Sequence, residues 1–314
     1  MSPLRRYAGY LSDNDRWIRF EHRPGDVVIS TPPKSGTTWT QMLCALMVFD
    51  GSQFPDKLDA ISPWLDSNIR TEREVFATYA RQDHQRFIKT HTPLDGLPMR
   101  DDVRYIVVAR DPRDVFESWQ NHRANIDREQ QVQLIRDACA SEGRPIPELP
   151  AELVAPTRAI EQFRTYVDAE ATTDIAVNLA NVLHHIDTGW QRRHEPNVTV
   201  FHFLDYQRDL VSEMKRLALF CGFDIAAERI AELAPAASLT SMRSRSAELI
   251  PEASMSDFWK DKDRFFRSAA RGEWQTHFSA EDLAHYDRRA RTLAGDDLFR
   301  WIHDESHDAG TTTE

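Results

Sequence analysis

The sequence predicts an α/β protein with a central parallel sheet flanked by helices. Short apolar segments alternate along the chain with segments of helical length, the order typical of parallel sheets. Residues 104–109 (RYIVVA) form a nearly continuous β-branched run, as in strands that are buried on both faces of such a sheet. Of the 314 residues, 41% are hydrophobic and 28% are charged, so the chain can bury a large core.

The first two predicted strands each lead into a segment rich in proline, glycine and hydroxyl groups. Residues 26–33 (DVVISTPP) predict the first strand, and residues 39–51 predict a helix that stops at Gly51. Residues 86–90 (RFIKT) predict the second strand. The prolines and Gly96 that follow it allow neither a helix nor a strand to continue.

The third and fourth predicted strands are each followed by a helix with a recognisable end. After the third strand, Asp111 is a good N-cap and Pro112 suits the first helical position. Residues 198–204 (VTVFHFL) predict the fourth strand, and residues 210–223 predict a helix closed by Gly222.

Residues 125–170 break this alternation. The stretch contains several prolines and is mostly polar, and we interpret it as a helical or lid-like insertion. Residues 305–314 have the composition of a loose tail. No boundary between independent domains is evident, so residues 1–314 are expected to form a single domain.

The net charge and the cysteine content limit which binding partners and which cellular location are expected. The formal net charge of -11 should repel a phosphate backbone, so nucleic acid is not an expected partner. Cys44, Cys139 and Cys221 lie far apart without a CxxC pair, which favours a reduced, metal-free protein in the cytoplasm. The longest apolar run, residues 42–49, is far shorter than the ~20 residues that cross a membrane, so no integral membrane contact is expected.

Residues 31–39 (TPPKSGTTW) have the composition of a phosphate-binding loop. They lie where a strand meets a helix N-terminus, at which free N–H groups and the helix dipole favour an anion. Lys34 adds a full charge in a chain with only six lysines among 39 basic residues. The pattern differs from GxxxxGK[ST], because the lysine precedes the glycine and no earlier glycine opens the loop.

Four segments resemble, in order, the motifs of the cytosolic-type sulfotransferases, which use 3′-phosphoadenosine 5′-phosphosulfate (PAPS). Residues 33–39 (PKSGTTW) are similar to the family's 5′-phosphosulfate loop, and residues 89–91 (KTH) to the segment with its catalytic histidine. Residues 105–118 (YIVVARDPRDVFES) resemble its 3′-phosphate segment. Residues 265–274 (FFRSAARGEW) resemble the late segment that closes over the same phosphate.

The resemblance implies a P-loop-NTPase-like sulfotransferase fold and a role for each matching residue. His91 would be the general base, and Lys34, assisted by Lys89, would stabilise the leaving oxygen. PAPS would be the cosubstrate and PAP, the bisphosphate nucleotide, the product, with no metal. The residues expected to bind the nucleotide are Lys34, Ser35, Gly36, Thr37, Thr38, Trp39, Arg110, Ser118, Thr240, Met242, Arg267, Arg271 and Gly272.

The chain departs from the family's pattern at several positions. The late motif has Ser268-Ala269 where the family has lysine and glycine, and Arg271 is expected to compensate. Met242 stands where the family has an aromatic ring against adenine. Residues 275–284 lack the threonine-valine core of the family's dimer segment, so a homodimer is left open and that dimer mode is not assumed.

The acceptor is less clearly indicated than the donor. His184, His185 and Trp190 fall on a helix that lines the acceptor pocket in the family, and an alternative is that they pack in the core. Four aromatic residues between the loop and KTH are candidates for an apolar acceptor wall or for core packing: Phe54, Trp64, Phe76 and Tyr79. A hydroxyl of a small molecule, a lipid or a glycolipid is expected as the acceptor, and the lysine-poor, arginine-rich usage indicates a bacterial source.

Two other functions are left open. A P-loop-like kinase or NTPase would also place a loop between strand and helix, although its chemistry needs Mg²⁺ and a Walker lysine. A catalytically silent nucleotide-binding protein would tolerate the altered late motif. Individual residues also have structural alternatives: an ordinary loop histidine for His91, core packing for Trp39, a salt bridge to Asp111 or Asp114 for Arg110, and a bond to its own helical turn for Ser118.

Overall fold

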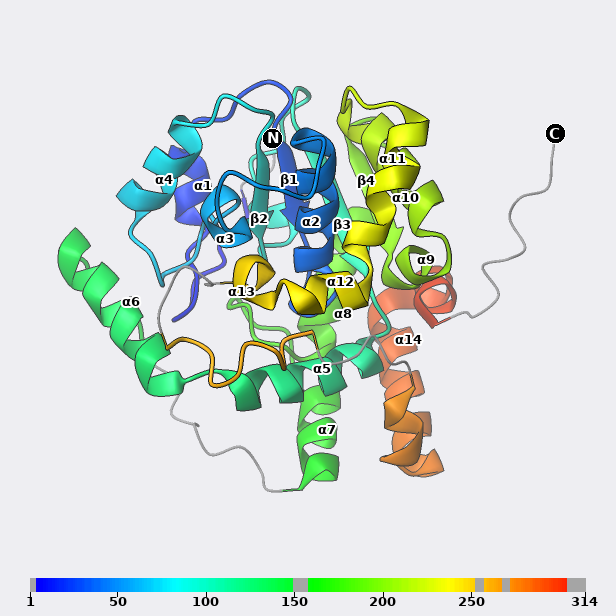
Figure 1. Ribbon diagram of the computed structural model, residues 1–314. Helices are drawn as coiled ribbons and strands as arrows, with labels where there is room; N and C mark the ends of the chain where they lie inside the picture. Colours follow the sequence, from blue (N-terminus) through cyan, green and yellow to red (C-terminus); the bar gives the residue numbers. More distant parts are fainter. Residues whose placement is uncertain (1–3, 149–157, 252–256, 267–271, 304–314) are drawn as a thin grey trace.

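The centre of the protein is a sheet of four parallel strands. The computed structural model describes residues 4–148, 158–251, 257–266 and 272–303, and its strands lie in the order β2-β1-β3-β4. Their bounds are β1 Val27–Ser30, β2 Phe87–Thr90, β3 Arg104–Ala109 and β4 Val198–His202. Figure 1 shows the sheet surrounded by helices, which confirms the predicted α/β class.

Local chemistry sets the ends of β1 and β4. β1 is shorter than the predicted residues 26–33, because Pro32 and Pro33 have no N–H to donate to a sheet. The prediction that β4 extends to residue 204 was wrong. His202 Nδ1 accepts a hydrogen bond from the backbone N–H of Leu204 at 3.1 Å and so caps α9 (Phe203–Arg208).

Helices cover both faces of the sheet. α2 (Thr37–Val48) packs on β1 and β2, and α8 (Leu179–Trp190) packs on β3 and β4. Val108 of β3 belongs to the apolar cluster that contains α2, whereas Val107 faces α8. A Cβ at Gly189 would lie only 2.6 Å from a methyl carbon of Val107, so glycine is needed for α8 to approach the sheet this closely.

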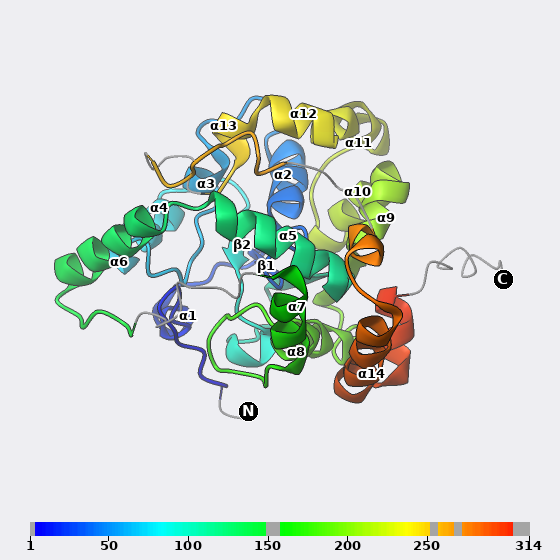
Figure 2. The same cartoon turned by 90° about the horizontal axis from the view of Figure 1, so that it is seen from below.

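Helix α5 (Pro112–Asn125) crosses the edge at which the strands end (Figures 1 and 2). Its start is as predicted, with Pro112 in the first position and the Asp111 side chain accepting a hydrogen bond from the N–H of Arg113 at 2.9 Å. Because parallel strands place their carboxyl ends together, the segments after β1, β2 and β3 meet beneath this helix.

The other helices surround this core, and α6 lies at its periphery, where its last residue, Glu142, accepts a hydrogen bond from the backbone N–H of Glu72 at the start of α4 (Figure 1). Gly222, with φ of 70°, closes α10 as predicted. α6 and α7 fall in the stretch that was predicted to be helical, and a lid function stays a prediction. The bounds are α1 Asp15–Arg19, α3 Leu58–Ile61, α4 Glu72–Ala80, α6 Arg128–Glu142, α7 Ala159–Asp168, α10 Leu210–Cys221, α11 Ala227–Leu233, α12 Leu239–Ser244, α13 Ser246–Leu249 and α14 Ala280–His303.

The predicted loose tail, residues 305–314, lies outside the described residues. Within the described ranges, none of the helices combines the length and the apolar character that a membrane span requires.

Candidate active site

The segment between β1 and α2 has the backbone of an anion-binding loop. Lys34 and Gly36 both have positive φ, 68° and 110°, and α2 begins immediately afterwards at Thr37. The first N–H groups of a helix have no intrahelical partner, so this end of α2 offers donors and a positive dipole. Glycine is required at residue 36, because a Cβ there would also lie 3.0 Å from Cδ2 of Phe203.

Arg110, at the end of β3, lies directly beside this loop. Its Nη1 donates a hydrogen bond to the backbone oxygen of Lys34 at 3.1 Å, and its Cζ lies 4.6 Å from the centre of the Phe203 ring. Asp111 instead pairs with Arg113 at 2.7 Å. The structure thus brings the two predicted cationic residues together, although two strands and three α-helices lie between them in the sequence.

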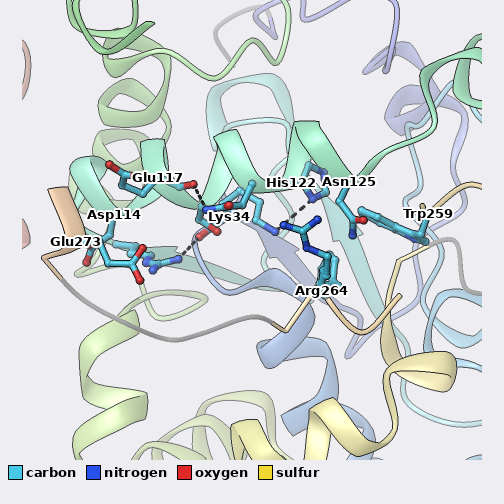
Figure 3. A pocket seen from close by; sticks show the side chains of 12 residues that line it. Lys34, Asp114, Glu117, His122, Asn125, Trp259, Arg264 and Glu273 are labelled. Carbon is cyan, nitrogen blue, oxygen red and sulfur yellow. Dashed lines mark hydrogen bonds between the residues drawn. The ribbon is translucent and has the colours of Figure 1, made fainter. Parts of the chain in front are cut away.

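Two adjoining cavities meet at Lys34 and Arg110. The loop cavity encloses about 820 Å³, part of it open to solvent, and is lined by Lys34, Gly36, Thr37, Thr38, Trp39, Arg110, Ser118, His122, Phe203, Leu239, Met242, Pro251, Phe265 and Phe266. The helix cavity runs along α5 and shares five of these residues, Lys34, Arg110, Ser118, His122 and Phe265. Figure 3 shows the Lys34 side chain running toward His122 in the helix cavity, with Glu117 and Glu273 at the other end. Eight predicted binding residues therefore line one cavity of ligand size.

Buried polar atoms without partners indicate that the loop cavity is built for a polar ligand. Ser35 Oγ, Trp39 Nε1 and Arg110 Nε are all buried and make no hydrogen bond within the described residues. Trp39 and Arg110 line the loop cavity, whereas Ser35 is buried in the loop and does not line it. Buried donors are normally paired, and a cluster of unpaired ones calls for an explanation. Among the residues that the structure describes, no group of three or more His, Cys, Asp or Glu is placed to hold a metal ion.

The apolar side of the loop cavity is formed by aromatic residues and Met242. The Trp39 ring meets the rings of Phe203 and Tyr206 edge-on, with centroid distances of 5.3 and 5.6 Å. Trp39 is only partly buried and also lines the cavity, so it packs against the core and still presents one side to a ligand. A flat apolar ring system would fit this side of the cavity.

Several predicted binding residues are not brought to the loop cavity. Thr240 is exposed on α12, whereas its neighbours Leu239 and Met242 line the cavity. The backbone N–H of Gly272 donates to Asp114 Oδ1 at 3.0 Å, and Gly272 lines a different hollow beside Arg110. Arg267 and Arg271 lie outside the described residues.

The electrostatics of Lys34 are unusual for a lysine. Burial, followed by the charges of Arg110 and Lys89, lowers the pKa of its ammonium to about 7. Its Nζ lies 4.4 Å from the centre of the Phe265 ring and 3.4 Å from His122 Nδ1. Burial, followed by the charges of Lys34 and Lys89, holds the pKa of His122 well below its usual range, so His122 is neutral and accepts this bond.

The lowered pKa of Lys34 predicts that anion binding takes up a proton at alkaline pH. At pH 8 Lys34 is neutral in most molecules. A bound phosphate would favour the ammonium form and raise the pKa of Lys34 again. Calorimetry of PAP binding in buffers of different ionisation enthalpy should therefore show uptake of close to ~1 proton at pH 8 and much less at pH 6. Phosphate monoesters have lost their second proton at pH 8, so the ligand itself contributes little.

Lys34→Met should abolish this proton uptake and weaken PAP binding. Lys89→Met is the informative comparison, because Lys89 helps to lower the pKa of Lys34 without lining either cavity. Its uptake at pH 8 should become smaller while PAP binding is retained. Unchanged proton uptake in Lys34→Met would contradict the proposed ionisation.

His91 directly follows β2, and one of its two ring nitrogens is engaged in a hydrogen bond. Its Nδ1 lies 2.7 Å from the backbone oxygen of Thr31, which can only accept, so Nδ1 carries the hydrogen and Nε2 keeps its lone pair. Burial and the charge of Lys89 hold the pKa of His91 well below its usual range. The ring is thus neutral near pH 7, with a nitrogen able to accept a proton.

His91 lines a third hollow, the histidine cavity, which adjoins the same loop. Pro32 and Pro33 line the histidine cavity, and the next residue, Lys34, lines the loop cavity. The two hollows therefore meet the chain at consecutive residues of one loop. The other lining residues of the histidine cavity are Tyr7, Pro93, Asp174, Ile175, Ala176, Asn181, Val182, His184 and His185.

Lys89 is buried in β2 and lines none of these three cavities. Its Nζ lies 5.3 Å from the centre of the Trp64 ring, and its backbone oxygen accepts a hydrogen bond from Leu65. Its charge nevertheless contributes to the lowered pKa of both Lys34 and His91. In this structure Lys89 affects Lys34 and His91 through the electrostatic field of its charge and does not line any of these cavities.

The predicted acceptor residues are only partly brought together. His184 and His185 line the histidine cavity, but Trp190 packs on Trp301 with a centroid distance of 4.7 Å. The core-packing alternative holds for Tyr79 and Phe76, which meet Phe20 edge-on at 5.6 and 5.4 Å. Phe54 packs against Phe49 at 5.9 Å, and Trp64 alone of the four reaches His91.

Sequence reasoning missed His122 and Phe265. His122 follows Ser118 by four residues on α5, so the two share one helix face, and this spacing was the signal that could have found it. Phe265 was noted only as part of the late motif. Its place beside Lys34 depends on a contact between segments far apart in the chain.

Comparisons with known proteins identify the family of this chain. The model of the sulfotransferase domain family matches residues 24–297. The glycolipid sulfotransferase of Mycobacterium bovis is 41% identical over 308 residues, which cover 95% of this chain and 94% of that protein, and that of Mycobacterium tuberculosis is 41% identical over 307 residues, with the same coverage. An amine sulfotransferase of Oryctolagus cuniculus is 24% identical, with 93% and 88% covered.

Two solved structures share the fold. Mouse sulfotransferase SULT7A1 in complex with PAP has a TM-score of 0.67 at 17% identity, with 94% of each chain covered. Retinol dehydratase in complex with androsterone and PAP has a TM-score of 0.67 at 20% identity, with 90% of this chain and 84% of that chain covered. With a family model matched from residue 24 to residue 297 and relatives that are 41% identical along almost the whole chain, this protein belongs to the sulfotransferase domain family.

Proposed function

We propose that this sulfotransferase moves a sulfuryl group from PAPS to a hydroxyl group of a glycolipid, with His91 as the general base. The observation that carries the proposal is the contact between Arg110 and the backbone of Lys34 beside three unpaired buried donors. A ligand with two separate phosphate groups would satisfy donors on both sides of this contact. The nucleotide of PAPS has that form.

The 5′-phosphate end would bind at the start of α2. The backbone N–H groups of residues 36–38 and the hydroxyls of Thr37 and Thr38 would donate to it, and Lys34 would supply a cation. The 3′-phosphate would bind Arg110 and Ser118, with Arg267, Arg271 and Gly272 closing over it. The adenine would lie between Trp39 and Met242.

The chemistry asks the protein for position and charge rather than for covalent bonds. His91 Nε2 would take the proton of the acceptor hydroxyl as the acceptor oxygen forms its bond to sulfur. The bond between sulfur and the phosphate oxygen breaks, and that oxygen leaves with PAP. Lys34, protonated once the anion is bound, would stabilise the negative charge that develops on this oxygen.

A lipid or glycolipid acceptor is supported by the relatives and by the histidine cavity. The mycobacterial relatives that are 41% identical to this chain are glycolipid sulfotransferases by name. The histidine cavity places the apolar side chains of Pro93, Ile175 and Val182 beside the polar side chains of Tyr7 and His184. A molecule with an alkyl part and a hydroxylated head would find partners for both.

Transfer from radiolabelled PAPS tests the proposal directly. The purified protein should sulfate glycolipids faster than the free sugar, a fatty alcohol or a phenol at equal concentration. Label on a phenol alone would overturn the glycolipid assignment. Failure to bind PAP would overturn the assignment of the nucleotide site.

The remaining expectations stay predictions. A kinase or NTPase would require tight binding of ATP with Mg²⁺, which competition against PAP would reveal, and a silent nucleotide-binding protein would bind PAP without turnover. The cytoplasmic location is supported by Cys44, Cys139 and Cys221, which are free and buried. A homodimer is a separate prediction, and light scattering of the purified protein would measure it.

A further inference from the structure

A single buried carboxylate gathers the chain around His91. Asp66 lies in the segment between α3 and α4 and is fully buried. Its carboxylate accepts hydrogen bonds from Thr90 Oγ1 at 2.9 and 3.0 Å, from Thr92 Oγ1 at 2.6 Å and from Trp64 Nε1 at 2.7 Å. These three donors are buried as well.

All three donors touch His91 or flank it in the chain. Thr90 and Thr92 are its neighbours, and the N–H of Thr92 also donates to Thr90 Oγ1 at 3.0 Å, which makes a tight turn with His91 at its tip. The Trp64 ring meets the His91 ring edge-on, with a centroid distance of 4.8 Å. Asp66 therefore fixes both sides of the turn and the ring that packs against the imidazole.

His91 depends on this support because the sheet no longer holds it. The register of β2 with β1 ends at the pair of Ser30 and Thr90, one residue before His91. Beyond that point the imidazole has one hydrogen bond, to Thr31. The backbone oxygen of Thr92 accepts a hydrogen bond from Ser30 Oγ at 2.7 Å, so the turn is anchored to β1 as well as to Asp66.

A carboxylate suits this position better than a neutral side chain of the same shape. Burial raises the pKa of Asp66, and the hydrogen bonds from Thr92, Thr90 and Trp64 oppose that shift. Every group that faces the carboxylate in these bonds is a donor, so both oxygens must accept. An asparagine would direct an NH₂ group at one of these donors and leave a buried group unpaired.

We propose that Asp66 is the positioning residue of His91: it holds the turn 90–92 and the Trp64 ring so that the imidazole keeps the orientation in which Nε2 meets the acceptor hydroxyl. This rests on the proposed role of His91 as the base. Misplacement of a catalytic group by about 1 Å can lower the rate ~10²-fold, so the support of the turn has a direct kinetic consequence.

The substitution Asp66→Asn should lower kcat by ~10- to 100-fold, with the Kd of PAP changed less than ~2-fold. Thr92→Val, which removes one donor and keeps the shape of the side chain, should lower kcat in the same direction by a smaller factor. The matched control is Ser62→Ala. Ser62 is buried in the same segment and donates to the backbone oxygen of Phe87 at 2.6 Å, at the far end of β2 from His91.

If Asp66 were only a packing residue, kcat per folded molecule would be the same in Asp66→Asn and Ser62→Ala. That result, with folding of both variants measured by thermal unfolding, would overturn the proposal. Should Asp66→Asn fail to fold, Thr92→Val decides in the same way: its kcat per folded molecule should fall below that of Ser62→Ala, and equal values would overturn the proposal.

A double-mutant cycle separates this proposal from the role of His91 itself. Once His91 is alanine, the further change Asp66→Asn should lower kcat less than ~2-fold, because there is no imidazole left to position. A second loss as large as in the native background would overturn the positioning role. Full activity of His91→Ala alone would instead overturn the proposed base, and that single variant reveals it.

A spectroscopic readout needs no turnover. In ¹⁵N NMR of histidine-labelled protein, with His91 assigned from the spectrum of His91→Ala, the native ring should show a single tautomer with hydrogen on Nδ1. Asp66→Asn should give a mixture of tautomers, whereas Ser62→Ala should not. A single unchanged tautomer in Asp66→Asn would contradict the proposal.

Discussion

Replacing His91 with alanine is expected to lower kcat by ~10²–10⁴ and to leave the Kd of PAP nearly unchanged. The reason is that the two functions depend on different residues. His91 lines the histidine cavity, whereas predicted phosphate ligands such as Lys34 and Arg110 line the loop cavity, whose lining does not include His91. Removal of the imidazole takes away the proton acceptor and none of the donors to the nucleotide.

The measurement is steady-state turnover together with calorimetric binding of PAP. His285→Ala serves as the control, because His285 pairs with Asp168 on the surface at 2.6 Å, far from the sheet edge in sequence and in contacts. The control should retain full turnover. Undiminished turnover in His91→Ala would show that another group takes the proton or that the chemistry needs no base.

Arg110→Met is expected to weaken PAP binding by ~10²-fold or more. Hydrogen bonds to charged groups contribute about 1.5–3 kcal/mol each, and the guanidinium offers a buried Nε that has no hydrogen-bond partner among the described residues. Binding of 5′-AMP, which has no 3′-phosphate, should change far less. The ratio of the two losses assigns Arg110 to one end of the nucleotide and corrects for any disturbance of the Lys34 backbone.

Arg113→Met is the matched control for this experiment. Arg113 is three residues away and similarly buried, but its guanidinium pairs with Asp111 and lies 3.8 Å from the centre of the Trp274 ring. Its loss should lower the melting temperature and leave the preference for PAP over 5′-AMP intact. Equal losses of PAP and 5′-AMP in Arg110→Met would contradict the 3′-phosphate assignment.

Local patterns in the sequence were sufficient for the sheet and for the backbone of the loop between β1 and α2. The β-branched run 104–109 is β3, and Asp111 and Pro112 start α5 as predicted, because caps and strand propensity depend on neighbours in the chain. The loop 31–39 follows the same logic, since its glycine and lysine conformations are set within a few residues. The end of β4 was missed because a histidine cap at residue 202 outweighed the apolar pattern.

Contacts between segments that are distant in the chain could not be predicted from the sequence. The place of His122 beside Lys34 and the network of Asp66 each join residues more than twenty positions apart. Nothing in the spacing of aromatic residues distinguishes Trp64, which packs on His91, from Tyr79, which packs in the core. Thr240 shows the same limit. The sequence did not indicate which face of α12 points into the loop cavity, and Thr240 lies on the exposed face while Leu239 and Met242 line the cavity.

The central claim is that a single nucleotide joins two anion sites, one at the start of α2 and one at Arg110. A crystal structure with PAP tests it most directly. We expect the 5′-phosphate within hydrogen-bond distance of the N–H groups of residues 36–38, and the 3′-phosphate on the guanidinium of Arg110 and the hydroxyl of Ser118. A nucleotide bound with its 3′-phosphate away from Arg110, or outside the loop cavity, would contradict the account.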